Sequence, residues 1–444
     1  MNGGCMRRQI YHYLKRWKVT KSRMPLLVRG ARQIGKTYTI SAFAKAEFED
    51  VVIINFELNP EYARCFTELD PKKILERITF ISKKTITPGK SLLFLDEIQE
   101  CQAAIQSLRY FKEHLPDLHV IGAGSLLEFA LNDAVFRMPV GRVEFLYMYP
   151  LNFKEYLNAT GQEKLAQHIS SATLKTGVDE VAHQELLKQL KLFFVLGGMP
   201  AVIQAHINGE SLQRCQAIQA FLLNTFRNDF GKYASQINQQ YCRRVFEKAP
   251  LLIAKNFKYV DIDPDVQSRS LKTAVNLLIQ ANLLFPIYET QAITLPLNAA
   301  VNEKKFKLLF LDIGLANYST KLDAEILMQD DLLLLHQGAL AEQFVGQELI
   351  ATQPNFQEPT LFFWQNHNRN DAAEVDYVMP YHNKIIPIEV KSGKNGRLRS
   401  LHAFMKKHNS LLGIKISQQP LHMDNNILSL PLYMISELER IHQS

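Results

Sequence analysis

The chain has 444 residues, 47% hydrophobic and 21% charged, a globular composition that excludes a wholly disordered protein and predicts about three domains. No apolar run reaches the ~20 residues of a membrane-spanning helix, and no signal-peptide apolar core stands at the start. The net charge is 51 − 44 = +7. Five cysteines lie without Cys-x-x-Cys spacing, which predicts a reducing, cytoplasmic location and no zinc site.

Positive charge is concentrated at two places in the sequence. Residues 1–46 contain eleven Lys or Arg and no Asp or Glu, whereas the remaining chain carries 40 basic against 44 acidic residues, a net of −4. A second cluster between Lys384 and Lys407 has seven Lys or Arg opposed only by Glu389. Such patches attract polyanions such as nucleotides, nucleic acids or acidic lipids, although a solvated surface is the alternative.

The first 158 residues alternate between predicted strands and helices. Apolar runs predict strands near 24–29, 51–56, 91–95, 119–123 and 143–148, with helices near 38–48, 71–82 and 103–114. Continuous apolar runs are typical of parallel strands that helices cover on both faces. The sequence therefore predicts an α/β domain over 1–158, with a basic helix at its start.

The rest of the chain predicts three further segments. Residues 159–220 read as a helical lid, interrupted by glycines at 197–200. In 221–330, an apolar-periodic helix after Ser268 leads into strands at 283–288 and 306–311. This pattern predicts a winged helix, although a helical lid would give the same helical signal. In 331–444, a helix at 339–351 and strands at 361–364, 375–379 and 385–390 predict a second α/β domain.

A phosphate-binding loop stands between the first predicted strand and helix. The residues Gly30, Ala31, Arg32, Gln33, Ile34, Gly35, Lys36 and Thr37 fit G-x-x-x-x-G-K-[ST], and Tyr38 follows them. The glycines let backbone N–H groups surround phosphates at a helix N-terminus. Lys36 is expected to reach the terminal phosphates of a bound nucleotide, and the Thr37 hydroxyl to bind Mg²⁺.

A pair of carboxylates ends the strand at 91–95. Asp96 is expected to hold Mg²⁺ and Glu97 to act as general base on the attacking water. No Asn-Lys-x-Asp segment for guanine recognition occurs, which favours ATP over GTP. Together with the loop, this pair predicts a P-loop ATPase.

With these motifs, the chain resembles the prokaryotic AAA+-type ATPases that carry a C-terminal domain of unknown function. The resemblance also rests on Gly124-Ser125, Gly141-Arg142, Pro150–Phe153, Gly197–Pro200, Lys307–Gly314 and Ala339–Glu348. It implies that Ser125 senses the γ-phosphate and that Asn55 orients Glu97. It further implies an arginine at the nucleotide, Arg142 or its rival Arg137, supplied in cis or by a neighbour in a homo-oligomer.

Acidic residues with an adjacent lysine mark the C-terminal region. Asp376 and Glu389-Val390-Lys391 lie on neighbouring predicted strands, the Asp…Glu-x-Lys pattern of restriction-type nucleases. Glu342, on the preceding helix, is expected to join them at one or two Mg²⁺ or Mn²⁺ ions. The basic residues expected to contact DNA phosphates are Lys394, Arg397 and Arg399.

The sequence thus favours an AAA+-type parallel sheet, a helical and winged-helix middle and a restriction-endonuclease-like C-terminal α/β domain. The favoured function is ATP hydrolysis coupled to action on nucleic acid. The alternative is an ATP-gated switch or scaffold whose C-terminal domain binds a protein or DNA without cleaving it. We expect His367 and His402 at the surface and Trp364 in the core.

Overall fold

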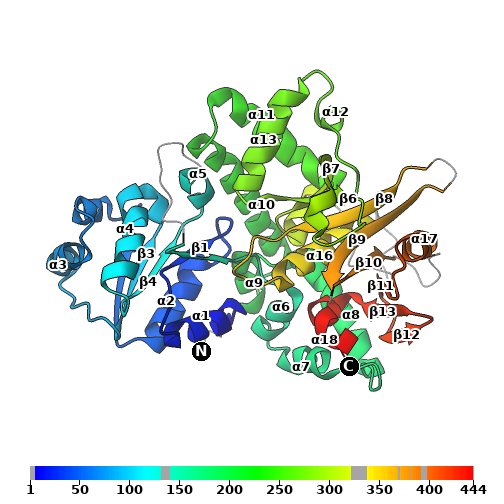
Figure 1. Cartoon of the computed structure of the whole chain (residues 1–444), viewed down its shortest axis with the longest axis horizontal. Coiled ribbons are helices and arrows are strands. Elements are labelled where there is room, and N and C mark those ends of the chain that lie inside the picture. Colours follow the sequence, from blue (N-terminus) through cyan, green and yellow to red (C-terminus); the bar gives the residue numbers. More distant parts are fainter. Residues whose placement is uncertain are drawn as a thin grey trace.

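The computed structural model describes residues 6–131, 141–321, 338–368, 371–381, 383–391 and 398–443. Two β-sheets lie on opposite sides of a central group of helices (Figure 1). Among the described residues, no helix combines the length and apolar character needed to cross a membrane.

The first sheet is parallel throughout and has the strand order β2-β3-β4-β1-β5. Its strands are β1 (Leu26–Arg29), β2 (Asp50–Asn55), β3 (Ser91–Asp96), β4 (His119–Ala123) and β5 (Glu144–Tyr147). The register pairs Asn55 with Asp96 and Asp96 with Ala123, so these strands end at one edge. The expected parallel α/β fold is confirmed, and its polar strand ends are brought together.

Helices cover both faces of this sheet because apolar side chains point to both faces of its inner strands. One face packs on α1 (Ile10–Val19) and α2 (Lys36–Glu47), and the other on α3 (Pro71–Ser82) and α4 (Gln102–His114). The Asp70 side chain begins α3 by accepting a hydrogen bond from the Lys72 N–H, with Pro71 at the first helical position. In α1, two lysines of the basic N-terminus pair with Glu47, which reduces the positive patch there.

Helices dominate the middle of the chain. They are α5 (Leu127–Leu131), α6 (Phe153–Ala159), α7 (Glu163–Ser171), α8 (Glu180–Leu196), α9 (Pro200–Ile207), α10 (Leu212–Asp229), α11 (Gln236–Lys248), α12 (Tyr259–Ile262), α13 (Ser268–Gln280) and α14 (Ile313–Thr320). Short 3₁₀ helices are η1 (Pro60–Phe66), η2 (Ile98–Glu100), η3 (Phe230–Lys232), η4 (Ala249–Leu252), η5 (Leu297–Ala300) and η6 (Leu432–Glu437).

The second sheet is mixed, with the order β12-β13-β11-β10-β9-β8-β6-β7. Its strands are β6 (Leu284–Thr290), β7 (Val301–Phe310), β8 (Leu361–Asn366), β9 (Ala373–Tyr381), β10 (Lys384–Val390), β11 (Gly413–Ser417), β12 (His422–Asp424) and β13 (Ile427–Pro431). The accompanying helices are α16 (Gly338–Thr352), α17 (Arg399–His408) and α18 (Leu438–Gln443).

The ribbon on which the winged-helix prediction for 221–330 rests is part of this larger sheet. The ribbon β6–β7 follows α13 as expected, but β6 also pairs in parallel with β8, with Ile287 opposite Leu361. An isolated two-stranded ribbon is marginal in water, and joining the larger sheet buries its apolar side. Strands from both sides of the boundary predicted at 330/331 therefore belong to one sheet, and the division into domains there stays a prediction.

A tight junction joins the helical middle to the second sheet. The Gly197-Gly198 turn between α8 and α9 packs on the start of α14, where Asp312 accepts hydrogen bonds from the N–H groups of Gly198 and Leu315. A Cβ atom on Gly198 would lie 2.0 Å from the Leu151 backbone oxygen, so only glycine fits. The segments Gly197–Pro200 and Lys307–Gly314, which contributed to the family resemblance, thus meet at this junction.

The two sheets share one hydrophobic core and are joined by polar contacts. The Glu348 carboxyl of α16 accepts a 2.8 Å hydrogen bond from the Phe153 N–H at the start of α6. Lys154 pairs with Glu437 at 2.7 Å. Burial raises the pKa of Glu348 to about 8, so this carboxyl is mostly protonated at neutral pH. The C-terminal part is therefore packed against the first domain rather than tethered to it.

Candidate nucleotide-binding and catalytic site

The phosphate loop lies between β1 and α2, as the sequence predicts. Gly30 and Gly35 have φ angles of 135° and 90°, which residues with a side chain rarely adopt. A Cβ atom on Gly30 would also lie 2.2 Å from the Met148 backbone oxygen. The loop thus needs glycine at both positions, and it leads directly into the N-terminus of α2.

Lys36 is the buried cation of this loop. Its Nζ atom donates hydrogen bonds to the backbone oxygens of Gly30 at 2.8 Å and Ala31 at 2.7 Å. Burial lowers the pKa of Lys36 to about 8, although the Glu97 and Asp96 carboxylates act in the opposite direction. Phosphate oxygens could replace the two carbonyl acceptors without a large movement of the side chain.

Asp96 lies at the end of β3 beside Thr37. The Thr37 hydroxyl donates to Asp96 Oδ2 at 3.0 Å, and the Asn55 amide donates to the same oxygen at 2.9 Å. Asn55 was expected to orient Glu97, so this expectation is corrected: the parallel register places Asn55 opposite Asp96. A hydroxyl and a carboxylate are the oxygen ligands that Mg²⁺ prefers, so this pair fits that ion.

Glu97 follows at a strained backbone position with a φ angle of 47°. Its Oε2 atom accepts a 2.7 Å hydrogen bond from Gln99 and a 3.4 Å one from Ser125. Gln99, which no sequence motif indicated, therefore orients the carboxylate that was predicted as general base. Ser125 lies at the predicted place, beyond the end of β4.

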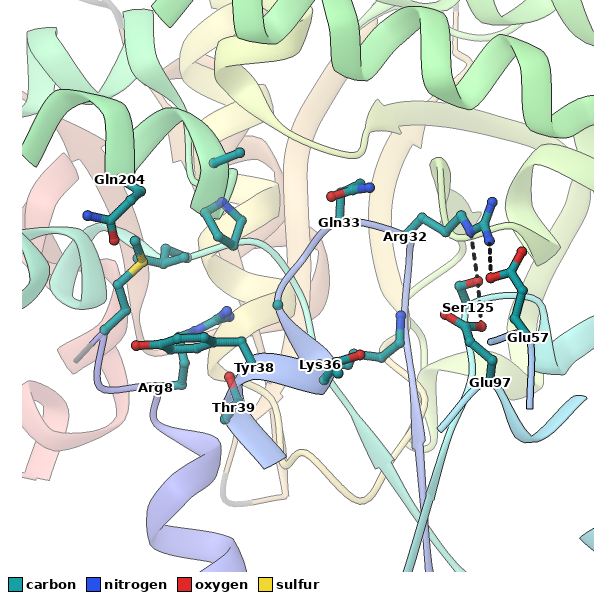
Figure 2. Close-up of a pocket in the computed structure, with 16 residues that line it drawn as sticks. Arg8, Arg32, Gln33, Lys36, Tyr38, Thr39, Glu57, Glu97, Ser125 and Gln204 are labelled. Carbon is teal, nitrogen blue, oxygen red and sulfur yellow. Dashed lines mark hydrogen bonds and ion pairs between the residues drawn. The ribbon is translucent and has the colours of Figure 1, made fainter. Parts of the chain in front are cut away.

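Lys36, Thr37, Glu97 and Ser125 line a cavity of about 640 Å³. Figure 2 shows Arg32, Glu57, Glu97 and Ser125 at its right-hand end, with Lys36 near the middle. Tyr38, Gln204 and Arg8 lie at the left-hand end. Acidic and basic side chains thus gather at one end of the cavity, and Tyr38, Gln204 and Arg8 form the other end.

Arg8 was counted in the sequence only as part of the basic N-terminus, but the structure buries it beside the loop. It donates to Glu155 at 3.1 Å, to the Ile34 backbone oxygen at 3.0 Å and to the Tyr149 backbone oxygen at 2.5 Å. Only the tertiary fold brings these groups together, because Arg8 and Glu155 lie 147 residues apart.

Arg142 lies away from this cavity in its own chain. Arg142 is about half exposed, pairs with Glu113 at 3.1 Å and does not line the cavity. Its contacts within the described residues are with Glu113 and the Gly141 backbone oxygen, and its role toward nucleotide, in cis or from a neighbouring subunit, stays a prediction. Its rival Arg137 lies outside the described residues.

The acidic residues of the C-terminal sheet gather around a lysine that was not predicted. Lys307 of β7 is 1% exposed and contacts Glu374 at 2.5 Å and Glu342 at 3.4 Å. The pKa of Glu342 is raised by burial and by the neighbouring Asp376. Asp376 accepts from the Val390 N–H at 2.7 Å.

Glu389 completes this cluster through its 2.5 Å contact with Lys391. Among the residues described, no group of three or more His, Cys, Asp or Glu side chains is arranged to hold a metal ion. The metal set of Glu342, Asp376 and Glu389 is not among such groups and stays a prediction, and the buried ammonium of Lys307 lies beside Glu342. Lys394 and Arg397 lie outside the described residues. His367 and His402 are exposed and Trp364 is buried, as expected.

Three family models match successive parts of the chain. Residues 22–157 match a model described as an AAA domain, residues 187–326 a domain of unknown function (DUF8612), and residues 337–433 a second one (DUF4143). No curated protein matches the sequence. The AAA-domain match spans all five strands of the first sheet and both motifs of the cavity. The chain thus contains an AAA-type domain, and the protein is an ATPase.

Solved structures with a similar fold include a Walker-type ATPase of Pyrococcus abyssi. Its identity is 13% over 71% of this chain and 95% of that one, with a TM-score of 0.45. The ORC2 protein of Aeropyrum pernix, in ADPNP and ADP complexes, has 13% identity over 72% and 93%, with a TM-score of 0.37. Identities and scores at this level carry no argument about function.

Proposed function

We propose that the cavity beside the phosphate loop binds Mg²⁺-ATP and hydrolyses it with residues of this chain. Lys36 and the loop N–H groups hold the phosphates. Thr37 and Asp96 would hold Mg²⁺, which neutralises phosphate charge when bound. Glu97 accepts a proton from the attacking water, and Gln99 keeps its carboxylate in place.

One observation carries this proposal: a buried lysine, a hydroxyl and a strand-end glutamate line one cavity, and the hydroxyl contacts the Asp96 carboxylate. Ser125 supports it, because its hydroxyl contacts Glu97 and can report whether a γ-phosphate is present. An ordinary structural cluster would not combine an anion-binding loop with carboxylates placed for a cation and a water.

ATP affinity should fall as pH rises above about 8, the pKa to which burial lowers Lys36. The triphosphate needs the charged lysine, so binding takes up a proton wherever free Lys36 is neutral. Affinity should be constant below this pKa and fall roughly tenfold per pH unit above it. Calorimetry from pH 7 to 9.5 measures this, and Lys36→Arg, which stays charged, is the control. A flat profile for the wild type would contradict the assignment.

We further propose that the C-terminal sheet binds nucleic acid without cutting it. The layout supports a nuclease-like fold: Glu342 lies on a helix, and Asp376 and Glu389 on adjacent strands. Lys307 supports binding over cleavage, because its ammonium already compensates Glu342, an acid that a nuclease would use for metal. The helix α17 buries Leu401 and Phe404 and exposes Arg399 and Lys406, a face suited to phosphates.

Binding to duplex DNA should weaken by at least ~10² between about 50 and 200 mM salt, because phosphate contacts release counterions. The double variant Arg399→Ala/Lys406→Ala should lower the slope of log affinity against log salt by about 2. The DNA should stay intact in Mg²⁺ or Mn²⁺. Affinity for a protein that does not depend on salt, with no affinity for DNA, would favour the scaffold function instead.

A further inference from the structure

The side chain of Arg32 lies at the phosphate end of the cavity, where no sequence motif assigns it a role. It is 20% exposed and comes from the third position of the phosphate loop. Its Nε atom donates to the Ser125 hydroxyl at 3.2 Å, and a terminal nitrogen lies 3.4 Å from Glu57 (Figure 2). The guanidinium therefore lies beside the residues proposed to meet the γ-phosphate and the attacking water.

Arg32 also joins the loop to the end of a distant helix. Its other terminal nitrogen contacts Asp229 Oδ1 at 2.6 Å, and Asp229 is the last residue of α10. The second Asp229 oxygen is buried and has no hydrogen-bond partner. A few residues further on, Lys232 pairs with Glu57 at 3.1 Å. The end of α10 is thus attached to the phosphate site by ion pairs.

The other arginine of the cavity cannot take this role. Among the described residues that line the cavity, the arginines are Arg8 and Arg32. Arg8 gives its donors to a carboxylate and two backbone oxygens at the far end, as described above. Arg32 instead contacts side chains, which can exchange partners without leaving a backbone group unsatisfied.

We propose that Arg32 binds the γ-phosphate of ATP within the same chain and gives up Asp229 to do so. This inference rests on the proposed ATP site. A guanidinium binds phosphate and carboxylate with the same planar donors, so the two compete for it. The γ-phosphate carries more charge than one carboxylate, and the charge on its oxygens is what an arginine stabilises during phosphoryl transfer.

The exchange couples nucleotide state to the helical middle of the protein. With ADP, Arg32 holds Asp229 and the end of α10 stays attached to the phosphate loop. With ATP, Asp229 loses its ion pair and this end of α10 is released. The Tyr233 ring, stacked on Phe129 of α5 with centroids 4.4 Å apart, lies next to the segment that would respond.

The test compares Arg32→Ala, Arg32→Lys and Asp229→Asn by ATP and ADP affinity and by turnover. Arg32→Ala should keep ADP affinity within about threefold, lose the preference for ATP and lower kcat at least ~10²-fold. Arg32→Lys should recover only part of this, since lysine lacks the planar donors. Asp229→Asn removes the competitor, so it should keep turnover and tighten ATP relative to ADP.

Opposite effects of the two substitutions separate this role from a structural ion pair. If the pair only supported the fold, Arg32→Ala and Asp229→Asn would lower turnover alike, and that result would overturn the proposal. Equal losses of ATP and ADP affinity in Arg32→Ala would also overturn it. If instead the wild type binds no ATP, or if Lys36→Ala binds ATP at wild-type affinity, the proposed ATP site itself fails.

Hydrogen exchange gives a readout that does not depend on turnover. In Glu97→Gln, which should retain bound ATP, amides near the end of α10 should exchange faster with ATP than with ADP. The same comparison in the double variant Glu97→Gln/Asp229→Asn should show little difference. Equal protection of this helix end by both nucleotides in Glu97→Gln would contradict the release of Asp229.

Discussion

Lys36→Ala should bind neither ATP nor ADP, whereas Glu97→Gln should bind ATP normally and hydrolyse it at least ~10²-fold more slowly. Lys36 is the buried ammonium inside the loop, and alanine leaves the phosphates without it. Glutamine keeps the shape of Glu97 and an oxygen that Gln99 can contact. It cannot take a proton from water, so the variant should keep ATP binding and lose most of its hydrolysis.

Titration calorimetry measures binding, and phosphate release measures turnover. Lys45→Ala on the exposed side of α2 and Glu100→Gln in η2 are matched controls, since both remove an exposed charge nearby. Both should behave as the wild type. ATP binding by Lys36→Ala at wild-type affinity, or full turnover by Glu97→Gln, would show that the site works by other residues.

The phosphate site could be predicted because its signals are local. A strand, a glycine turn and a helix follow one another within about twenty residues, and the physical reason for each glycine is visible in the sequence. The position of Asp96 follows from one rule, that parallel strands end at the same edge. The same rule gives the actual partner of Asn55, which is the residue opposite it in the register.

The ion pairs around the site could not be predicted, because they join residues that only the tertiary fold brings together. Arg8 and Glu155 lie 147 residues apart, and Arg32 and Asp229 lie 197 apart. The ribbon β6–β7 was visible as a local pattern, but its pairing with β8 crosses more than seventy residues. The spacing of hydrophobic residues predicts local helices and strands, but it does not indicate which distant segments pair.

Lys307 was not predicted as part of the C-terminal cluster, although the sequence around it indicates that it is buried. It begins an otherwise apolar run, Lys307–Leu311, and a lysine is almost never fully buried without acidic partners. Its position in the strand predicts burial, and burial requires carboxylates. The acids of the C-terminal cluster were predicted with a metal ion as their cation, and Lys307 was not considered beside them.

Lys307→Met should lower the free energy of unfolding by ~3–5 kcal/mol, the usual cost of removing one partner from a buried ion pair. Methionine fills the space of the lysine stem, so packing is largely kept. Glu342 and Asp376 are then buried together without the cation between them, and Glu374 loses its 2.5 Å partner. Thermal or urea unfolding measures the loss.

The loss should be larger at pH 8 than at pH 5. Burial raises the pKa values of Glu342 and Asp376 above those of the unfolded chain, so the folded state keeps their protons more tightly. Stability of this kind is full below the unfolded pKa and is lost as pH rises through the folded one. Without Lys307 these folded pKa values rise further, which widens the difference between the two pH values.

Two further variants decide whether charge compensation is the cause. Lys305→Met removes a lysine from the same strand that is 46% exposed, and it should cost no more than ~1 kcal/mol. Adding Glu342→Gln to Lys307→Met should restore part of the stability, because one of the uncompensated acids is removed. If Lys307→Met unfolds like the wild type at both pH values, the cluster does not depend on the lysine, and a cation from solution becomes the better account of how these acids are held together.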